Sequence, residues 1–174
     1  MDIRSADEND FEELRSFYII MNEVITKRHH NYHEENPYFP SDQMMLKAIK
    51  GGYQYIGIED NKIVAAMMAD HECDDSYMHA KWLVDAAKDE FLVLHALRVL
   101  PEYSGRGYAR QLMNCVIEQG KATGQKSLRL DVLEGYEDPL RLYAPLGFQH
   151  VDTVEILYED IGIPKRFCLL EKVL

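Results

Sequence analysis

The spacing of apolar and polar residues predicts alternating strands and helices in the first half of the chain. Apolar side chains recur at three- and four-residue steps where helices are expected, and in short β-rich runs where strands are expected. The predicted elements are a strand at Asp2–Ser5, a helix from Asp7 to about His29, a loop at Asn31–Pro40, a helix capped by Ser41 and ended by Gly51-Gly52, and strands at Tyr53–Glu59 and Lys62–Asp70.

The pattern in the second half is clearer, apart from Cys73–Lys88, where Trp82-Leu83-Val84 fits either strand or helix. Phe91–Leu100 is a nearly continuous apolar run, which is typical of a central strand covered on both faces. The later elements are an amphipathic helix at Gln111–Gly120 that ends near Gly120–Gly124, a strand at Leu128–Leu133, a short helix at Pro139–Leu146, and an antiparallel pair at Phe148–Tyr158 and Phe167–Val173 joined through Gly162 and Pro164.

Composition predicts one domain over residues 1–174 with a substantial core, because 47% of the residues are hydrophobic. The net charge of −11 argues against a nucleic-acid partner and favours a cationic substrate such as an amine, unless the acidic groups are only a solvated surface. Three separate cysteines, the lack of a membrane-spanning apolar run and the lack of a signal sequence predict a cytoplasmic protein with reduced thiols.

A glycine-rich turn, Ser104–Arg110, follows the apolar run and precedes the amphipathic helix. Gly105 and Gly107 allow a sharp turn and close approach to an anion, and a helix start offers N–H groups and partial positive charge. The turn therefore predicts a phosphate site. A dinucleotide fingerprint would need glycine where Arg110 stands, and the lysine-containing triphosphate loop is missing from the sequence.

The turn resembles the acetyl-CoA signature [Q/R]-x-x-G-x-[G/A] of the GNAT superfamily of N-acetyltransferases, with Gly107 and Ala109 at the small positions. Leu97–Tyr103 and Leu142–Phe148 resemble the family's Val-x-Pro-x-aromatic and Leu-Tyr-x-x-x-Gly-Phe elements. Two departures are Ser104, where Gln or Arg is usual, and Tyr136, where many members carry Asn. The resemblance implies an α/β fold with a mixed, mostly antiparallel sheet of about seven strands, about four helices, and splayed central strands that hold acetyl-CoA.

Acetyl transfer requires a neutral amine, and an amine of pKa ~10.4 is neutral in about one molecule in 2,500 at pH 7. A general base whose pKa lies near neutral pH can remove the proton from the amine, and histidine is the side chain with such a pKa. His95-Ala96-Leu97-Arg98-Val99 resembles the strand of arylalkylamine N-acetyltransferases whose histidine is assigned as base, which makes His95 the candidate; a hydrogen-bonded core histidine is the alternative. Glu90 is the fallback base. By resemblance, Tyr143 protonates the departing thiolate; a packed tyrosine with a solvated hydroxyl is the alternative.

The resemblance also implies where acetyl-CoA is bound. A backbone N–H around Leu97–Val99 would stabilise the thioester oxygen, and backbone N–H groups of the turn would hold the pyrophosphate. The expected cofactor-binding residues are Leu97, Arg98, Val99, Ser104, Gly105, Arg106, Gly107, Tyr108, Ala109, Arg110, Tyr136 and Tyr143.

The sequence thus predicts an N-acetyltransferase that moves an acetyl group from acetyl-CoA to a primary amine of a small molecule or peptide within a ternary complex. No metal is expected, because the histidines at 29, 30 and 33 and the segment His71–Asp75 fit solvated loops. Tyr32, Tyr38 and Phe39 either line the acceptor pocket or pack in the core. A homodimer is possible. The competing hypotheses are a catalytically silent acyl-CoA-binding module and, more distantly, a nicotinamide-binding enzyme.

Overall fold

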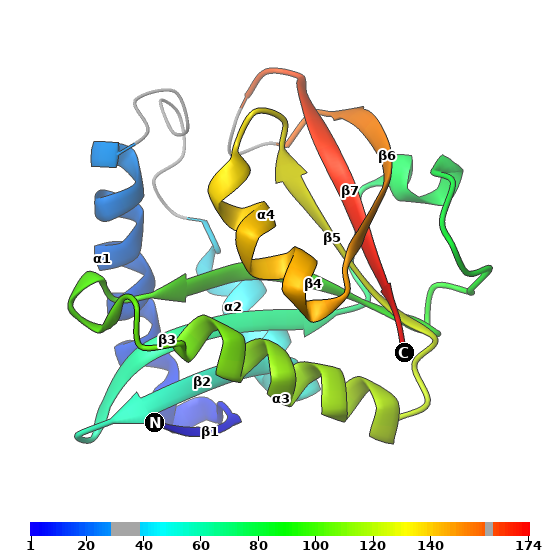
Figure 1. The fold of residues 1–174 in the computed structure, drawn as a ribbon. Helices are drawn as coiled ribbons and strands as arrows, with labels where there is room; N and C mark the ends of the chain where they lie inside the picture. The colour runs from blue at the N-terminus through cyan, green and yellow to red at the C-terminus, as the bar shows by residue number, and fades with distance from the viewer. Residues whose placement is uncertain (29–38, 159–161) are drawn as a thin grey trace. The chain divides into compact units, whose positions relative to one another are not determined.

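The computed structural model describes residues 1–28, 39–158 and 162–174, and it contains a seven-stranded sheet in the order β1-β2-β3-β4-β5-β7-β6 (Figure 1). The expected mixed sheet with four α-helices is therefore confirmed. The strands are β1 (Asp2–Ser5), β2 (Gln54–Glu59), β3 (Lys62–Asp70), β4 (Phe91–Val99), β5 (Ser127–Leu133), β6 (Gln149–Ile156) and β7 (Lys165–Val173). The helices are α1 (Phe11–Arg28), α2 (Asp42–Gly51), α3 (Tyr108–Ala122) and α4 (Glu137–Tyr143), with short 3-10 turns η1 (Glu8–Asp10), η2 (Asp75–His79), η3 (Pro101–Tyr103) and η4 (Ala144–Leu146).

The chain divides into two compact units, and unit 1 comprises Met1–Ala69, His95–Cys115 and Glu159–Gly162. Strands β1, β2 and β3 pair antiparallel, and α1 and α2 pack beside each other (Figure 1). Apolar side chains of the helices and of β3 form the core; those that are almost fully buried are Leu14, Phe17, Tyr18, Met45, Ala48, Ile63, Val64, Met67 and Met68.

Unit 2 comprises Asp70–Leu94, Val116–Tyr158 and Ile163–Leu174. β5 pairs antiparallel with β7 along its whole length, and β7 pairs antiparallel with β6. The start of β4 pairs in parallel with β5 over three residues, Phe91–Val93 against Ser127–Arg129. This short parallel ladder makes the sheet a mixed one, and β5 continues beyond it to Leu133.

Several element boundaries differ from the sequence prediction for identifiable reasons. The first helix begins at Phe11, because Asp7 caps η1 and Asp10 completes its capping box. β4 ends at Val99, because Pro101 begins η3. Two further boundaries moved. The third helix begins at Tyr108, directly after the glycine turn. The helix expected at Pro139–Leu146 is instead α4, which begins at Glu137 and ends at Tyr143, followed by the 3-10 turn η4.

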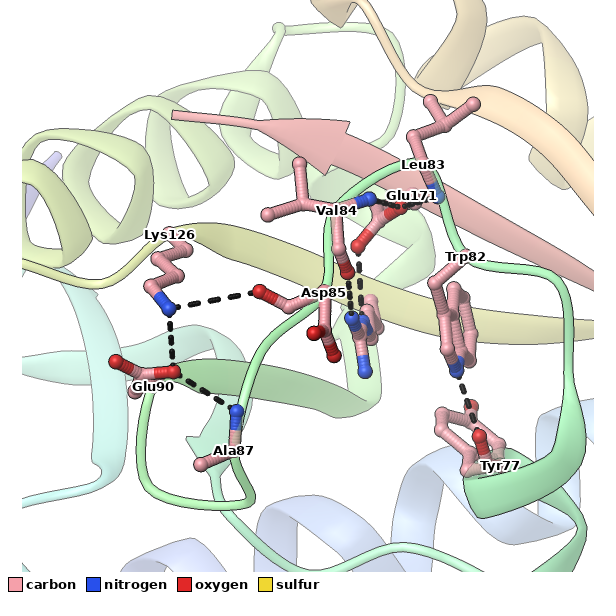
Figure 2. Close-up of polar contacts among 10 residues, drawn as sticks. Tyr77, Trp82, Leu83, Val84, Asp85, Ala87, Glu90, Lys126 and Glu171 are labelled. Atoms are coloured by element: carbon pink, nitrogen blue, oxygen red, sulfur yellow. Dashed lines mark hydrogen bonds and ion pairs between the residues drawn. The ribbon is translucent and has the colours of Figure 1, made fainter.

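The ambiguous segment Cys73–Lys88 contains the 3-10 turn η2 but forms neither a strand nor an α-helix. Its backbone is instead held by side-chain hydrogen bonds, with Glu171 of the sheet and with Trp82 within the segment. The N–H groups of Leu83 and Val84 donate to the Glu171 carboxylate of β7, and the indole N–H of Trp82 donates to the Tyr77 carbonyl oxygen (Figure 2). Apolar periodicity does not register hydrogen bonds of this kind, which explains why the sequence pattern here was ambiguous.

Candidate active site

The glycine turn connects η3 to α3 within unit 1 and has the backbone conformation that the sequence predicted. Gly105 and Gly107 have φ of 77° and 78°, a left-handed conformation that favours glycine. A Cβ added to either residue would meet nothing within 4 Å, so open space surrounds this backbone. Within the described residues, the first α3 amide that bonds back to the turn is that of Gln111, which donates to the Gly107 carbonyl oxygen at 3.0 Å. The preceding N–H groups are therefore available to an anion.

A side-chain cluster that the sequence analysis missed fixes the flanks of the turn. Glu59, at the end of β2, accepts hydrogen bonds from the Tyr108 hydroxyl and, at 3.3 Å, from the Arg106 guanidinium. The guanidinium carbon also lies 4.8 Å from the centre of the Tyr103 ring, which stacks on Tyr108 with 6.2 Å between ring centres. Since Glu59 carries both a cationic and a hydroxyl partner, its charge near the turn is compensated.

The second half of β4 contains an irregularity that the apolar run did not indicate. Ala96 has a φ of 50°, a left-handed value that is uncommon for alanine and costs free energy. The hydroxyl of Tyr18, from α1, donates to the Ala96 carbonyl oxygen at 3.2 Å. Left-handed residues within strands accompany bulges, which redirect the neighbouring groups. The irregularity lies beside His95 and Leu97, two of the predicted site residues.

The remaining predicted residues of unit 1 lie close together along the chain. His95, Leu97, Arg98 and Val99 are half-buried on β4, and the guanidinium of Arg98 donates to the Leu97 carbonyl oxygen at 2.9 Å. Ser104 and Arg110 are exposed, whereas Tyr108 is buried and Ala109 is half-buried at the start of α3. Unit 1 therefore contains the part of β4 that bears the candidate base, and the whole candidate phosphate turn.

Unit 2 contains the other three candidates, Glu90, Tyr136 and Tyr143. Tyr143 is the last residue of α4, half-buried, with its ring edge-on to Phe148 at 5.6 Å between centres. The Phe148 N–H donates to the Tyr143 carbonyl oxygen at 3.2 Å. Tyr136 occupies the N-cap position of α4 and makes no side-chain cap hydrogen bond there.

The contacts of the Glu90 carboxylate indicate a structural role for this residue. Its carboxylate accepts hydrogen bonds from the Lys126 ammonium at 2.6 Å and from the Ala87 N–H at 2.8 Å (Figure 2). The hydrogen bond from Lys126, followed by that from Ala87, lowers the pKa of the Glu90 carboxyl below its ordinary value. A carboxylate with a lowered pKa is a weaker base, which disfavours the fallback role.

The other clusters considered from the sequence add no ligand set. No group of three or more histidine, cysteine, aspartate or glutamate side chains suited to a metal occurs in residues 1–28, 39–158 and 162–174. His71 bonds through Nδ1 to the Phe91 carbonyl oxygen at 2.7 Å. Tyr32, Tyr38 and the histidines at 29, 30 and 33 lie outside the described residues, whereas Phe39 is described and half-buried. Among the described helices, none has the length and apolar character to cross a membrane.

A comparison with protein families shows to which family the chain belongs. The sequence matches the model of the acetyltransferase (GNAT) family over residues 14–148. The chain belongs to this family. The matched span includes most of α1, all of β4, the glycine turn and the Leu142–Phe148 element.

Two curated relatives carry similar names. Over 106 residues the chain is 26% identical to an uncharacterized N-acetyltransferase, YjgM, of Escherichia coli, covering 49% of this chain and 64% of that protein. Over 74 residues it is 30% identical to an uncharacterized N-acetyltransferase, MJ1207, of Methanocaldococcus jannaschii, covering 42% of this chain and 33% of that protein. The matches thus span less than two thirds of each relative.

Solved structures show the same fold. A GNAT-family acetyltransferase from Streptococcus agalactiae superimposes with a TM-score of 0.76 at 21% identity, covering 99% of this chain and 95% of that one. The family's expected use of acetyl-CoA agrees with the open glycine turn at the start of α3.

Proposed function

We propose that this protein transfers an acetyl group from acetyl-CoA directly to a primary amine in a ternary complex, with His95 as general base and Tyr143 as general acid. The observation that carries the proposal is the glycine turn. Its left-handed glycines have open surroundings and lie between η3, which follows the strand that bears His95, and the start of α3. A silent acyl-CoA-binding module is the alternative.

The turn suits the pyrophosphate of acetyl-CoA in both space and chemistry. An anion can approach Gly105 and Gly107 without meeting protein atoms, and the amides before Gln111 supply donors. Arg106 is engaged by Glu59, whereas Arg110 on α3 is exposed and supplies positive charge beside the turn. Ser104 has a shorter reach than the usual Gln or Arg, so backbone donors carry most of the binding in this proposal.

In the proposed reaction His95 takes a proton from the acceptor ammonium, leaving a lone pair to attack the thioester that acetyl-CoA supplies. Negative charge then develops on the thioester oxygen, and a backbone N–H of the Leu97–Val99 stretch stabilises it. The Leu97 amide is the first candidate, because it follows the left-handed Ala96. Tyr143 gives its hydroxyl proton to the departing thiolate, which leaves as free CoA, and the surplus proton of the new amide nitrogen restores the tyrosine hydroxyl.

An amine screen tests this function. The protein is mixed with acetyl-CoA and peptide N-termini, lysine peptides, polyamines, aminoglycosides or arylalkylamines, and released thiol is measured against an amine-free blank. Turnover of any amine that yields the acetylated product by mass spectrometry supports the enzyme. Saturable acetyl-CoA binding with no amine turned over favours the silent module.

Substituting the second glycine of the turn tests the phosphate site. Gly107→Val should weaken acetyl-CoA binding at least about tenfold by calorimetry, because the branched side chain fills the open space and disfavours the left-handed φ. Gly124→Val is the matched control: Gly124 has a φ of 75° and equally open surroundings, but lies after α3 in unit 2. Equal binding by the two variants would contradict the assignment.

Removing the hydroxyl of Tyr143 tests its proposed role as the general acid. Tyr143→Phe should lower kcat by roughly 10–100-fold while acetyl-CoA binding is retained, because the ring contact with Phe148 survives and only the proton donor is lost. The loss should shrink with a thioester whose thiol is more acidic, since such a thiolate leaves without protonation. A uniform loss with both donors would assign Tyr143 a packing role instead.

A further inference from the structure

The buried hydroxyl of Tyr18 contacts the strand at its most strained position. Tyr18 is 1% exposed in the core of unit 1, and the group within reach of its hydroxyl on β4 is the Ala96 carbonyl oxygen, at 3.2 Å. A carbonyl oxygen only accepts, so the tyrosine donates. The two residues are 78 positions apart in the chain, and this contact ties α1 to β4.

A second residue fixes the orientation of the hydroxyl. The side-chain amide nitrogen of Gln54, fully buried on β2, lies 3.4 Å from the Tyr18 hydroxyl and donates to it. The same nitrogen also lies 3.0 Å from the Met67 carbonyl oxygen and 3.2 Å from the Tyr55 carbonyl oxygen, so its two hydrogens are shared among three acceptors. With this amide donor beside the Tyr18 oxygen, the hydroxyl proton is directed to the Ala96 carbonyl oxygen.

Tyr18 keeps this proton across the working pH range. Burial raises the pKa of its phenol to about 12, with smaller opposing contributions from the Gln54 hydrogen bond and the Arg98 charge. The hydroxyl is thus a permanent neutral donor.

Holding the Ala96 carbonyl also sets the next amide. Ala96–Leu97 is a trans peptide, since the one cis bond among the described residues is Phe39-Pro40. In a trans peptide the C=O and the following N–H point in opposite directions within one plane. A donor that fixes the Ala96 oxygen therefore fixes the direction of the Leu97 N–H.

We propose that Tyr18 is a positioning residue for acetyl transfer: by holding the Ala96 carbonyl it directs the Leu97 N–H toward the oxygen of the reacting thioester. This inference rests on the proposed function. It also accounts for the retention of a left-handed alanine inside a strand, because a strained backbone persists only where surrounding contacts impose it.

The test removes the hydroxyl and keeps the ring. Tyr18→Phe should lower kcat roughly tenfold, with the KM for acetyl-CoA and for the amine within about twofold, because the misdirected amide is needed chiefly in the transition state. In the amide NMR spectrum the Leu97 resonance should shift. Tyr55→Phe is the control, since Tyr55 is another buried tyrosine of unit 1 and its substitution should change neither readout.

Restoring a hydrogen-bond donor at position 18 distinguishes a positioning role of Tyr18 from a packing role. 4-Aminophenylalanine at position 18 restores a donor at the same place and should recover most of kcat and the Leu97 resonance; a failure to recover both would overturn the proposal. An unshifted Leu97 amide with unchanged kcat in Tyr18→Phe would overturn it as well. If the parent protein acetylates no amine, the proposed function fails on its own, and the Leu97 resonance still decides whether Tyr18 orients this peptide.

Discussion

Arg129→Ala should lower the free energy of unfolding by about 3–5 kcal/mol, the largest stability loss expected of any single substitution discussed for this chain. Arg129 and Glu171 face each other across β5 and β7, with Nε and Oε1 2.9 Å apart and side chains 3% and 0% exposed. Removing the guanidinium leaves the Glu171 charge buried without its cation. Urea unfolding at neutral pH measures the loss.

The same guanidinium holds the irregular segment that follows η2. It donates to the Val84 carbonyl oxygen at 2.8 Å and lies over the rings of Trp82, at 4.3 Å, and Phe91, at 3.9 Å. The expected loss therefore includes contacts with this segment, and the loop should become more sensitive to protease than the sheet.

Two variants control the Arg129 experiment. Arg166→Ala removes an exposed ion pair with Glu134 and should leave unfolding essentially unchanged, because solvent screens such pairs. The double substitution Arg129→Met with Glu171→Leu should recover part of the stability by removing both charges together. An Arg129→Ala protein as stable as Arg166→Ala would show that the buried pair contributes no net stability.

His95→Ala should lower kcat by about 10²–10⁴-fold at neutral pH, the loss typical of removing a general base. The neutral imidazole is the active form in this proposal, so the parent kcat should rise with pH until the histidine is deprotonated and then level off. In His95→Ala this rise of kcat with pH should disappear. The residual rate should instead increase as the amine itself is deprotonated. A pH–rate profile for one accepted amine measures both effects.

Glu90→Gln is the matched comparison for the base. It removes the fallback carboxylate but keeps a hydrogen-bond acceptor for Lys126 and Ala87, and kcat should stay within about twofold. A large loss in Glu90→Gln together with full activity in His95→Ala would exchange the two roles. Retained activity in both would place the base elsewhere.

The order of strands and helices was predictable from sequence because each element buries one face or both. The continuous apolar run from Phe91 identified β4 as central, and the two strand-like runs at Phe148–Tyr158 and Phe167–Val173 identified the β6–β7 pair. Helix starts were less predictable, since a 3-10 turn capped by Asp7 precedes α1 and helical spacing alone does not reveal it.

The candidate site could be predicted where the residues that form the sequence motif also determine the backbone conformation. Gly105 and Gly107 signalled left-handed backbone directly, because glycine is the residue that tolerates it. Ala96 gave no such signal, although it has the same backbone handedness. Tyr18 and Glu59 were equally hidden: the first occurs in a helical apolar stripe and the second at a strand end, and their polar contacts join residues distant in sequence.

The irregular segment after η2 has a kinetic consequence. Leu83 donates to Glu171, a residue 88 positions later, and Val84 accepts from Arg129, 45 positions later. The Glu171 anchor is in place only when β7 has paired with β5, and closing so long a loop is slow. The segment should therefore acquire its structure after the sheet of unit 2, so that folding is completed by a piece of chain from the middle of the sequence.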